Sequence, residues 1–441
     1  MSPAGGMPRA LGEPITDGVG VVNFFNGRLL SARDMRREQD SHAALRERLG
    51  RAIGDGVVEG FEVTVPTASS ATDPVVAVSR GLAVNRNGTA LELTADVQLS
   101  LAKPLSSTGT PAPGVSSPFE SCSGLGRGAP LTDSGVYLLA VGPATQAVGR
   151  APVSGLGNEQ AACNTDYAAD GVRFATLALN LGPSLLADTD HLRNRVAHLM
   201  FGTEDLSSPD QPRRFRVERD PFGLPFSGYG LLDDLRAAEC LGDDQVPLAT
   251  IFWTPGIGIR FVDLWSVRRR IIRRSATGNW PELAGDRCIG EGEAIFLQFQ
   301  EQIDQVLRGT RDPAKLRATD RFSRLPPAGF LPLLTSNQPL GFDSVRFFTG
   351  IPTRHPVPFT EGAKLEQLIR SSFAYPPIDL SRGEMLWLYV VRENSQAAGG
   401  LPGTSIAQPY LVFASGFTPY AANAQFDLSR SDFANYAIEW I

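Results

Sequence analysis

Hydrophobic and polar positions alternate over short distances along most of the chain, which predicts short strands rather than long helices. The clearest strand-like runs are VVEGFEVTV (57–65), LAVNRNGTALEL (82–93), VYLLAV (136–141), FATLAL (174–179), MLWLYVV (385–391) and PYLVFAS (409–415). The second run contains Asn87-Gly88 between alternating apolar residues, which predicts a hairpin with a type I′ turn. A further pair of apolar runs around Pro255-Gly256 predicts another hairpin over residues 247–265.

The strongest helical pattern lies near the start of the chain, over residues 31–53. Ser31 is a suitable N-cap, and Asp34 stands three positions later, as in a capping box. Residues at a helical spacing of three or four positions then form one mostly apolar face, or stripe, of the helix. They are Met35, His42, Leu45, Leu49, Ala52 and Ile53. The residues before the helix, 19–25, have the composition of a strand. The helix has one apolar and one charged face, so it either packs on its own sheet or also faces a neighbouring subunit.

Later helices are predicted over residues 192–202, 231–242, 291–308 and 360–373, the last with Thr360 as its N-cap. Residues 325–334 are apolar but contain prolines, so we expect them to be extended.

Stretches rich in Pro, Gly, Ser or charge suggest the organisation of domains. They predict a mobile N-terminal arm over 1–18, a linker or long surface loop over 102–132 and an irregular segment over 203–230. Between them we expect a strand-helix-sheet module (19–101), a central β-rich module with long loops (133–245) and a C-terminal α+β region (246–441). The predicted fold class is α+β, with mostly antiparallel β modules, a few amphipathic helices and more than one domain.

Composition and charge narrow the range of functions. The chain of 441 residues is 42% hydrophobic, enough for substantial cores, and its net charge of −6 disfavours a general nucleic-acid role. No run of about 20 apolar residues is present, so we expect no membrane span. The first 18 residues lack the apolar region of a secretory signal, so we expect synthesis in the cytoplasm.

The residues that usually carry chemistry are sparse. The four cysteines form no C-x-x-C pair and fit a reducing compartment, although a Cys122–Cys163 disulfide stays open. Asp188, Asp190 and His191 are the one candidate cluster for a hydrolase or metal site, against the simpler interpretation of an acidic helix start. No G-x-S-x-G elbow or P-loop is found. We therefore predict a protein without catalytic activity, cofactor or metal.

One basic cluster, VRRRIIRRS (267–275), contains Arg268, Arg269 and Arg270. It could bind a phosphate backbone or an acidic protein neighbour. We favour the protein neighbour, because the arginine fork binds carboxylates with two hydrogen bonds.

The stretch FFNGRLLSARDMRREQD, followed by LRERLGRAIGDGVVEGFEV, resembles the start of proteins of phage-tail-like contractile injection systems. The likeness continues more weakly through VYLLAVGP, VAHLMFG, RFVDLWSVRRR, LPPAGFLPLL and PYLVFASG. The N-terminal part also resembles, more distantly, the type VI secretion baseplate adaptor TssK.

The resemblance implies a structural, homo-oligomeric subunit, a trimer or higher, at the baseplate or attached to it, in a particle that is released or anchored at a membrane. Its partners would be baseplate, sheath or spike subunits. Candidate subunit contacts are Phe24, Phe25, Asn26, Arg28, Leu29, Arg36, Arg37, Arg268, Arg269 and Arg270. The aromatic, loop-rich composition leaves a second hypothesis open, a tail-fibre-like adhesin that binds a surface or a glycan.

Overall fold

The computed structural model describes residues 19–101, 133–149, 151–152, 163–164, 166–204, 220–223, 228–271, 279–334, 340–353, 357, 359–391 and 408–416. The predicted segments 1–18 and 102–132 lie outside these residues, as does most of 203–230. The fold is α+β, as predicted, and is built from several small antiparallel sheets and helices.

Six short strands form two small antiparallel sheets near the start of the chain. One sheet contains β1 (Gly56–Gly60), β4 (Gly81–Val84) and β5 (Ala90–Leu93), and the other β2 (Val63–Thr64), β3 (Val75–Val78) and β6 (Val97–Ser100). The predicted strand over 57–65 is therefore divided between two sheets. The division falls at Gly60 and Phe61, whose φ angles are +62° and +53°. The Phe61 ring is fully buried, and this burial stabilises a backbone conformation that non-glycine residues rarely adopt.

The hairpin predicted around Asn87-Gly88 joins β4 to β5, but its turn is not of type I′. Asn85 N–H donates to Thr89 O at 3.0 Å, which leaves three residues in the loop. Of these, Gly88 has a positive φ of +85°, whereas a type I′ turn needs two such residues.

A four-stranded antiparallel sheet forms the centre of the molecule, in the order β10-β7-β11-β12. Its strands are β7 (Gly135–Val148), β10 (Tyr167–Ala178), β11 (Val246–Thr254) and β12 (Gly258–Asp263). The predicted hairpin over 247–265 is confirmed, and the strands predicted over 136–141 and 174–179 are confirmed but longer. The predicted boundary between residues 245 and 246 falls inside this sheet, because β11 pairs with β7.

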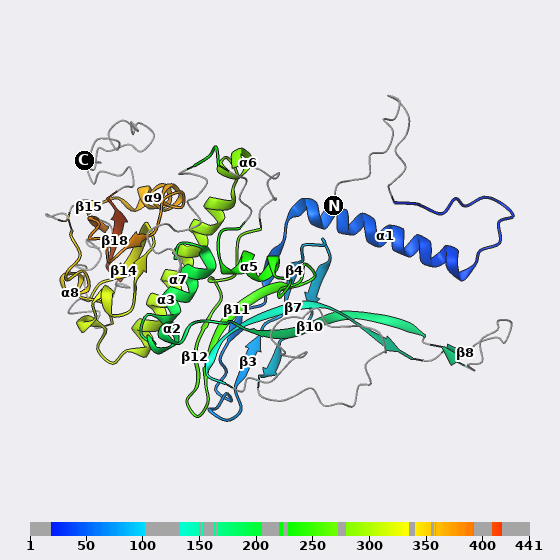
Figure 1. Cartoon of the computed structure of the whole chain (residues 1–441), viewed down its shortest axis with the longest axis horizontal. Helices are drawn as coiled ribbons and strands as arrows, with labels where there is room; N and C mark the ends of the chain where they lie inside the picture. The colour runs from blue at the N-terminus through cyan, green and yellow to red at the C-terminus, as the bar shows by residue number, and fades with distance from the viewer. Residues whose placement is uncertain are drawn as a thin grey trace, which may run out of the picture.

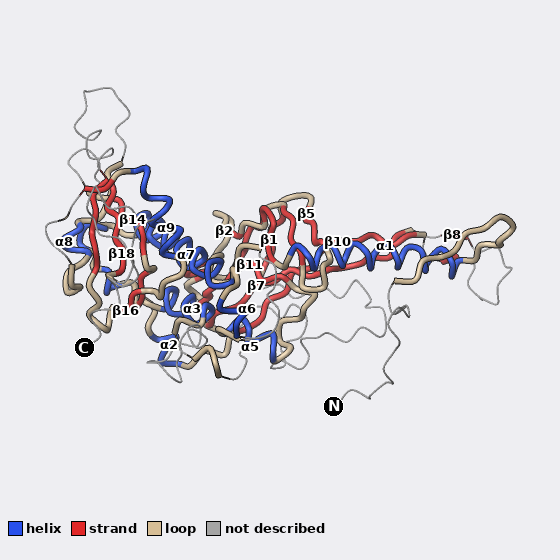
Figure 2. Tube along the Cα trace, turned by 90° about the horizontal axis from the view of Figure 1, so that it is seen from above, coloured by secondary structure: helices blue, strands red, loops and turns tan. Residues whose placement is uncertain are grey.

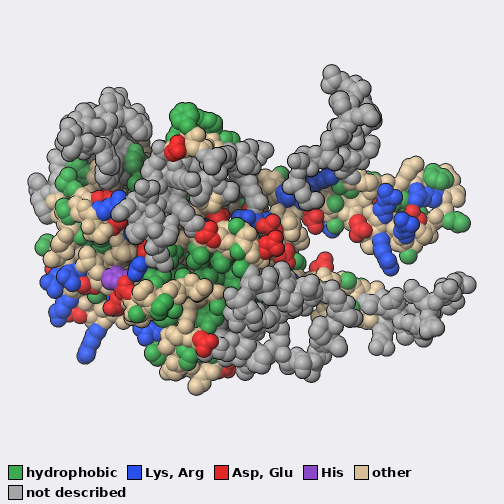
Figure 3. Space-filling view, viewed as in Figure 1, with side chains coloured by type: hydrophobic (Ala, Val, Ile, Leu, Met, Phe, Trp, Pro, Cys, Tyr) green, Lys and Arg blue, Asp and Glu red, His purple; other side chains and the backbone are tan. Residues whose placement is uncertain are grey.

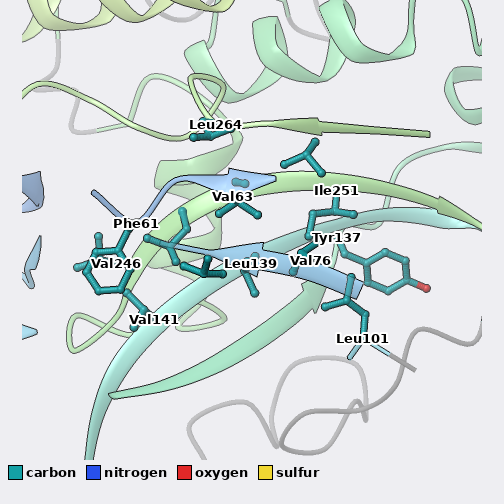
Figure 4. Packing of buried hydrophobic residues seen from close by; sticks show 14 of the residues in the cluster. Phe61, Val63, Val76, Leu101, Tyr137, Leu139, Val141, Val246, Ile251 and Leu264 are labelled. Atoms are coloured by element: carbon teal, nitrogen blue, oxygen red, sulfur yellow. The ribbon is translucent and has the colours of Figure 1, made fainter. Parts of the chain in front are cut away.

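Apolar side chains cover both faces of the central sheet. One face packs against the N-terminal sheets (Figure 4), and the side chains that meet there include Phe61, Val63, Val76, Tyr137, Leu139, Val141, Val246, Ile251 and Leu264. The other face packs against α2 (Pro183–Ala187), α3 (Leu192–Phe201) and α5 (Leu231–Ala237). The N-terminal and central sheets therefore share one core.

A second four-stranded sheet lies at the other end, in the order β14-β18-β17-β15. Its strands are β14 (Ala328–Pro332), β15 (Phe359–Thr360), β17 (Leu386–Val391) and β18 (Tyr410–Ser415). Helices α7 (Arg287–Gly309) and α9 (Leu365–Ser372) bring Phe299 and Leu368 to opposite faces of it. The prediction of Thr360 as an N-cap is wrong, because this residue pairs with β17 and the N-cap of α9 is Lys364.

The remaining described elements are short. They are β8 (Ala151–Pro152), β9 (Cys163–Asn164), α6 (Asn279–Leu283), η2 (Pro313–Lys315), η3 (Ala318–Asp320), β13 (Arg324–Leu325), α8 (Ser344–Phe347), η4 (Gly362–Lys364) and β16 (Ile378–Asp379).

The molecule is elongated (Figures 1 and 2). The C-terminal sheet lies at one end, and α3 and α7 pack together in the middle. At the other end, helix α1 (Ala32–Ile53) and the outer part of the β7–β10 ribbon project in the same direction beyond the core.

Candidate functional site

Residues 19–53 form a projecting structure that we call the α1 arm. Its helix begins as predicted, because Ser31 N–H donates to Asp34 Oδ2 at 3.0 Å and Asp34 N–H donates to Ser31 Oγ at 3.2 Å. The hydrogen bonds from Ser31, together with the Arg28 guanidinium 2.6 Å away, lower the pKa of Asp34 to about 2. This capping box and ion pair fix the turn that leads into the helix.

The segment before the helix is extended but is not a strand, so that prediction is wrong. It runs back along α1, where Ser41 Oγ donates to Gly20 O at 2.5 Å and Val22 N–H donates to Glu38 Oε2 at 3.2 Å. Side chains of the helix thus satisfy the backbone groups that a neighbouring strand would otherwise bind.

The arm is attached to the body near the C-terminal end of its helix. Gly50 lies against Gly88 so closely that a Cβ on Gly50 would stand 2.0 Å from Gly88 O. Beside this contact, Arg51 Nη1 donates to Asn87 O at 3.1 Å. From there α1 extends away from the sheets (Figure 1), and only Ser41 and Gly50 of its residues are buried.

The arm exposes an unusual amount of apolar surface. Its large apolar side chains that are 44–93% exposed are Val21, Phe24, Phe25, Leu29, Leu30, Met35, Leu45, Leu49 and Ile53. His42, which shares the stripe with these apolar residues, is also exposed, and its Nε2 lies 3.2 Å from Glu38 Oε1. Exposed apolar surface of this extent is typical of an interaction site.

The arm is also cationic on an acidic protein. Residues 19–53 contain seven arginines and four carboxylates, a net charge of +3, whereas the whole chain carries −6. Arg28 is paired with Asp34, and Arg51 binds the turn. The other five, Arg33, Arg36, Arg37, Arg46 and Arg48, are exposed and form no ion pair with any described residue.

Of the ten predicted contact residues, seven lie on the α1 arm and three lie in the basic cluster after β12. Phe24, Phe25, Leu29, Arg36 and Arg37 are exposed on the arm, and Asn26 lies in the turn that precedes the helix. Their role in binding stays a prediction.

The prediction that the basic cluster after β12 contacts a neighbouring subunit is wrong for Arg268. Arg268 is 7% exposed, and its guanidinium donates to the carbonyl oxygens of Gly60, Phe61 and Leu248. It therefore joins the N-terminal sheets to the central sheet and is not available to a partner. Arg269 is half-buried over the Phe201 ring, and Arg270 is exposed. The part of the cluster after residue 271 lies outside the described residues.

The candidate cluster at Asp188 and His191 borders a polar cleft of about 430 Å³. Its lining residues are Asp188, His191, Arg195, Glu204, Thr319, Ser323, Arg324, Asp379, Leu380 and Ser381. The cleft lies where the start of α3 meets the segment from η3 to β13.

Both ring nitrogens of His191 are occupied within the fold. Nδ1 lies 2.8 Å from Asp188 Oδ1, and Nε2 lies 2.9 Å from Thr319 O. Both partners are acceptors, so this geometry requires a protonated imidazolium. Burial acts against the charge, but the bonds to Thr319 and Asp188 outweigh it and raise the pKa of His191. An imidazolium with two acceptors has no lone pair for base catalysis or metal binding.

Further polar contacts strengthen the same junction. Asn194 Oδ1 accepts from Ser323 N–H and Arg324 N–H, both at 3.0 Å, and Asn194 Nδ2 donates to Arg324 O at 3.1 Å. Asp190 pairs with Arg321. The cluster therefore holds the central and C-terminal parts together, and no group of metal-binding side chains is found among the described residues.

A buried polar network that no sequence motif predicts lies between α3, β12 and α7. Arg193 Nε donates to Asp263 Oδ2 at 2.7 Å, and Arg193 Nη2 lies 3.4 Å from Glu301 Oε1. Gln298 Nε2 also donates to Asp263 Oδ2, at 2.9 Å. Burial and the nearby Asp263 carboxylate raise the pKa of Glu301 to about 7.

The cysteines differ from the prediction of four thiols. Cys240 is disulfide-bonded, whereas Cys288 is not in a disulfide. The Cys122–Cys163 pair lies outside the described residues and side chains, so it stays a prediction.

Within the described part of the chain, no helix is long and apolar enough to cross a membrane. No protein-family model and no curated protein matches the sequence.

Proposed function

We propose that this chain is a non-enzymatic structural subunit of a phage-tail-like contractile injection system, at the baseplate or attached to it. We further propose that the α1 arm binds it to neighbouring subunits. The resemblance of residues 23–64 suggests the class of particle. The observation that carries the proposal is the arm itself, a charged helix that leaves its apolar side chains in water.

The stability of helices explains why such an arm needs a partner. Most of the stability of helices in proteins comes from packing of their apolar face, and α1 leaves this face largely exposed. Burying one large apolar side chain contributes about 1.5–3 kcal/mol. Five such side chains, buried to half that extent, would supply on the order of 5 kcal/mol toward association, before the entropy cost of binding.

The test is a gentle pull-down of the tagged chain from its native host, followed by electron microscopy and mass spectrometry. We expect sheathed tubes together with sheath, tube and spike proteins. A chain isolated without any tail protein would refute the proposal.

A matched pair of variants asks whether the arm makes the attachment. Leu45→Glu with Leu49→Glu places charge on the exposed stripe of α1. Leu334→Glu with Leu340→Glu makes the same change at side chains that are 40% and 50% exposed in the C-terminal part. The arm variant should lose the particle proteins and the control should keep them, while both keep the circular dichroism of the parent.

One observation favours the second candidate function, a glycan- or surface-binding adhesin. Phe222 and Trp280 form an edge-to-face pair with centroids 5.4 Å apart, and they are 85% and 57% exposed. Exposed aromatic faces of this kind suit a ligand that is apolar on one side. Glycan-array binding that is lost in Trp280→Ala would support the adhesin, and an array without signal would remove it.

A further inference from the structure

The small sheet β1-β4-β5 has one buried and one open face. Ala83 and Leu91 on its inner face are buried in the core shared with the central sheet. On its outer face, the strand register places Glu59 opposite Leu82 and Leu82 opposite Glu92. Residues opposite one another in antiparallel strands point to the same face, so these three form a row across the sheet.

This outer face is acidic and exposed. Glu59 and Glu92 are exposed, Leu82 between them is half-buried, and the neighbouring Val58 is 49% exposed. Neither carboxylate forms an ion pair or hydrogen bond with a described residue. The face therefore presents two unpaired negative charges around a small apolar centre.

The charges of the arm and of the sheets are opposite. Residues 54–101 contain six carboxylates and two arginines, a net charge of −4, whereas the arm carries +3. Four of those carboxylates already have partners. Asp55 binds Arg86, Glu62 binds Arg268, Asp73 accepts from Ser100 Oγ and Asp96 accepts from Arg80 N–H. Glu59 and Glu92 remain for a partner outside this chain.

The arm of the same chain does not cover this face. It meets the sheet at the turn with Gly88 and then projects away from it, as two perpendicular views show (Figures 1 and 2). The space-filling view also shows the arm standing clear of the body (Figure 3), with arginine side chains on its surface. A single copy thus carries two complementary surfaces that its own geometry keeps apart.

We propose that the α1 arm of one copy docks on the outer face of the β1-β4-β5 sheet of a second copy, head to tail. This inference rests on the proposed structural function and names the partner of the arm. The apolar stripe of α1 would cover Val58 and Leu82, and its arginines would face Glu59 and Glu92. A head-to-tail interface closes into a ring when its rotation permits, which is the architecture of a particle component with several copies.

Pairing of two arms with each other is the main alternative. It would bury the same apolar stripe, but it would bring two arms that each carry a net charge of +3 together, and like charges across an interface oppose association. Docking on the acidic sheet of another copy buries the stripe and neutralises the charge at once.

Charge reversal in the full-length chain tests the proposal. Arg46 lies next to His42 and Leu49 on the exposed stripe, at the spacing of helical neighbours. The arm variant is Arg36→Glu with Arg46→Glu, and the sheet variant is Glu59→Arg with Glu92→Arg. A fourfold variant combines them, and Arg308→Glu with Arg370→Glu is a control at arginines that are 72% and 75% exposed elsewhere.

The readout is sedimentation velocity as a function of protein and salt concentration. We expect the parent and the control to self-associate more weakly as salt increases. Each double variant should raise the dissociation constant by roughly tenfold or more, and the fourfold variant should recover most of that loss, because its charges are again opposite.

Three results would overturn the inference. A fourfold variant that stays dissociated would show that the two surfaces do not meet. Unchanged or tighter association in the arm variant, with the sheet variant also unchanged, would indicate arm-to-arm pairing, because the two substitutions lower the net charge of the arm from +3 to −1 and so weaken the repulsion between two arms. A parent chain that is monomeric at all concentrations yet co-purifies with sheathed particles would refute the contact between copies and leave the structural function in place.

Discussion

The buried network around Glu301 makes a testable prediction about pH. The Glu301 carboxyl group is 24% exposed and lies 3.4 Å from Arg193 Nη2, with the Asp263 carboxylate bound to the same arginine. Replacing Glu301 with Gln keeps the shape and an acceptor oxygen but removes the charge. We expect Glu301→Gln to stabilise the protein at pH 8 and to leave it nearly unchanged at pH 5.

The sign follows from the direction of the shift. Burial and Asp263 raise the pKa of Glu301 from 4.5 to about 7 in the folded chain. The resulting stabilisation is complete below pH 4.5 and is lost as the pH rises through about 7. Such a shift corresponds to about 3 kcal/mol, which partial solvent exposure reduces to about 2 kcal/mol.

Thermal unfolding at the two pH values measures the effect. A gain of about 2 kcal/mol should raise the unfolding midpoint of Glu301→Gln at pH 8 by roughly 2 °C. Glu366→Gln is the control, because Glu366 is 75% exposed on α9. If Glu301→Gln lowered the midpoint at pH 8, attraction between Glu301 and Arg193 would outweigh burial, and the reasoning would be refuted.

Three further predictions concern the attachment of the arm and the junction beside the cleft. Gly88→Ala should loosen the arm, because a Cβ there would stand 1.9 Å from Glu47 O; faster hydrogen exchange in residues 45–53, with the central sheet unchanged, would confirm it. Asn194→Ala should lower the free energy of unfolding by about 2 kcal/mol, because it leaves partly buried backbone groups of Ser323 and Arg324 without this partner; chemical denaturation of the variant measures this, and a loss below ~1 kcal/mol would contradict it. His191 has a raised folded pKa, so its stabilising effect is present below pH 6.5 and is lost as the pH rises through the folded value. From pH 6 to pH 8, hydrogen exchange of residues 318–325 in the parent should therefore become faster by more than the pH dependence of amide exchange itself. This additional acceleration should be absent in His191→Gln.

Much of the secondary structure was predictable because local signals determine it. Ser31 and Asp34 form the capping box that their spacing indicates, and the apolar runs around Pro255-Gly256 form a hairpin. The failures occurred where distant residues decide the outcome. Residues 57–65 read as one strand, but burial of Phe61 divides them, and Thr360 pairs with β17 instead of capping a helix.

Contacts between residues that are distant in the sequence also limited the prediction of the candidate site residues. Arg268 has the sequence context of a surface charge, yet it is buried because the carbonyl oxygens of Gly60 and Phe61 lie far away in sequence and next to it in space. Glu301 and Asp263 are ordinary acidic residues in the sequence, and the pKa of Glu301 is raised only because the fold buries it and brings the Asp263 carboxylate close to it. No local pattern encodes such a meeting.

For the α1 arm, the structure adds meaning to a pattern that the sequence already contains. An amphipathic helix normally indicates an internal packing partner, since its apolar face needs cover. Here Leu45 and Leu49 keep the helical spacing of a packed face, but the fold leaves them 44% and 68% exposed. The contact with Gly88 also holds the helix base so closely that no side chain fits between them. The face is patterned for packing, is held away from its own sheet and is flanked by arginines without an ion pair among the described residues. These features support the proposal that it binds a partner outside the chain.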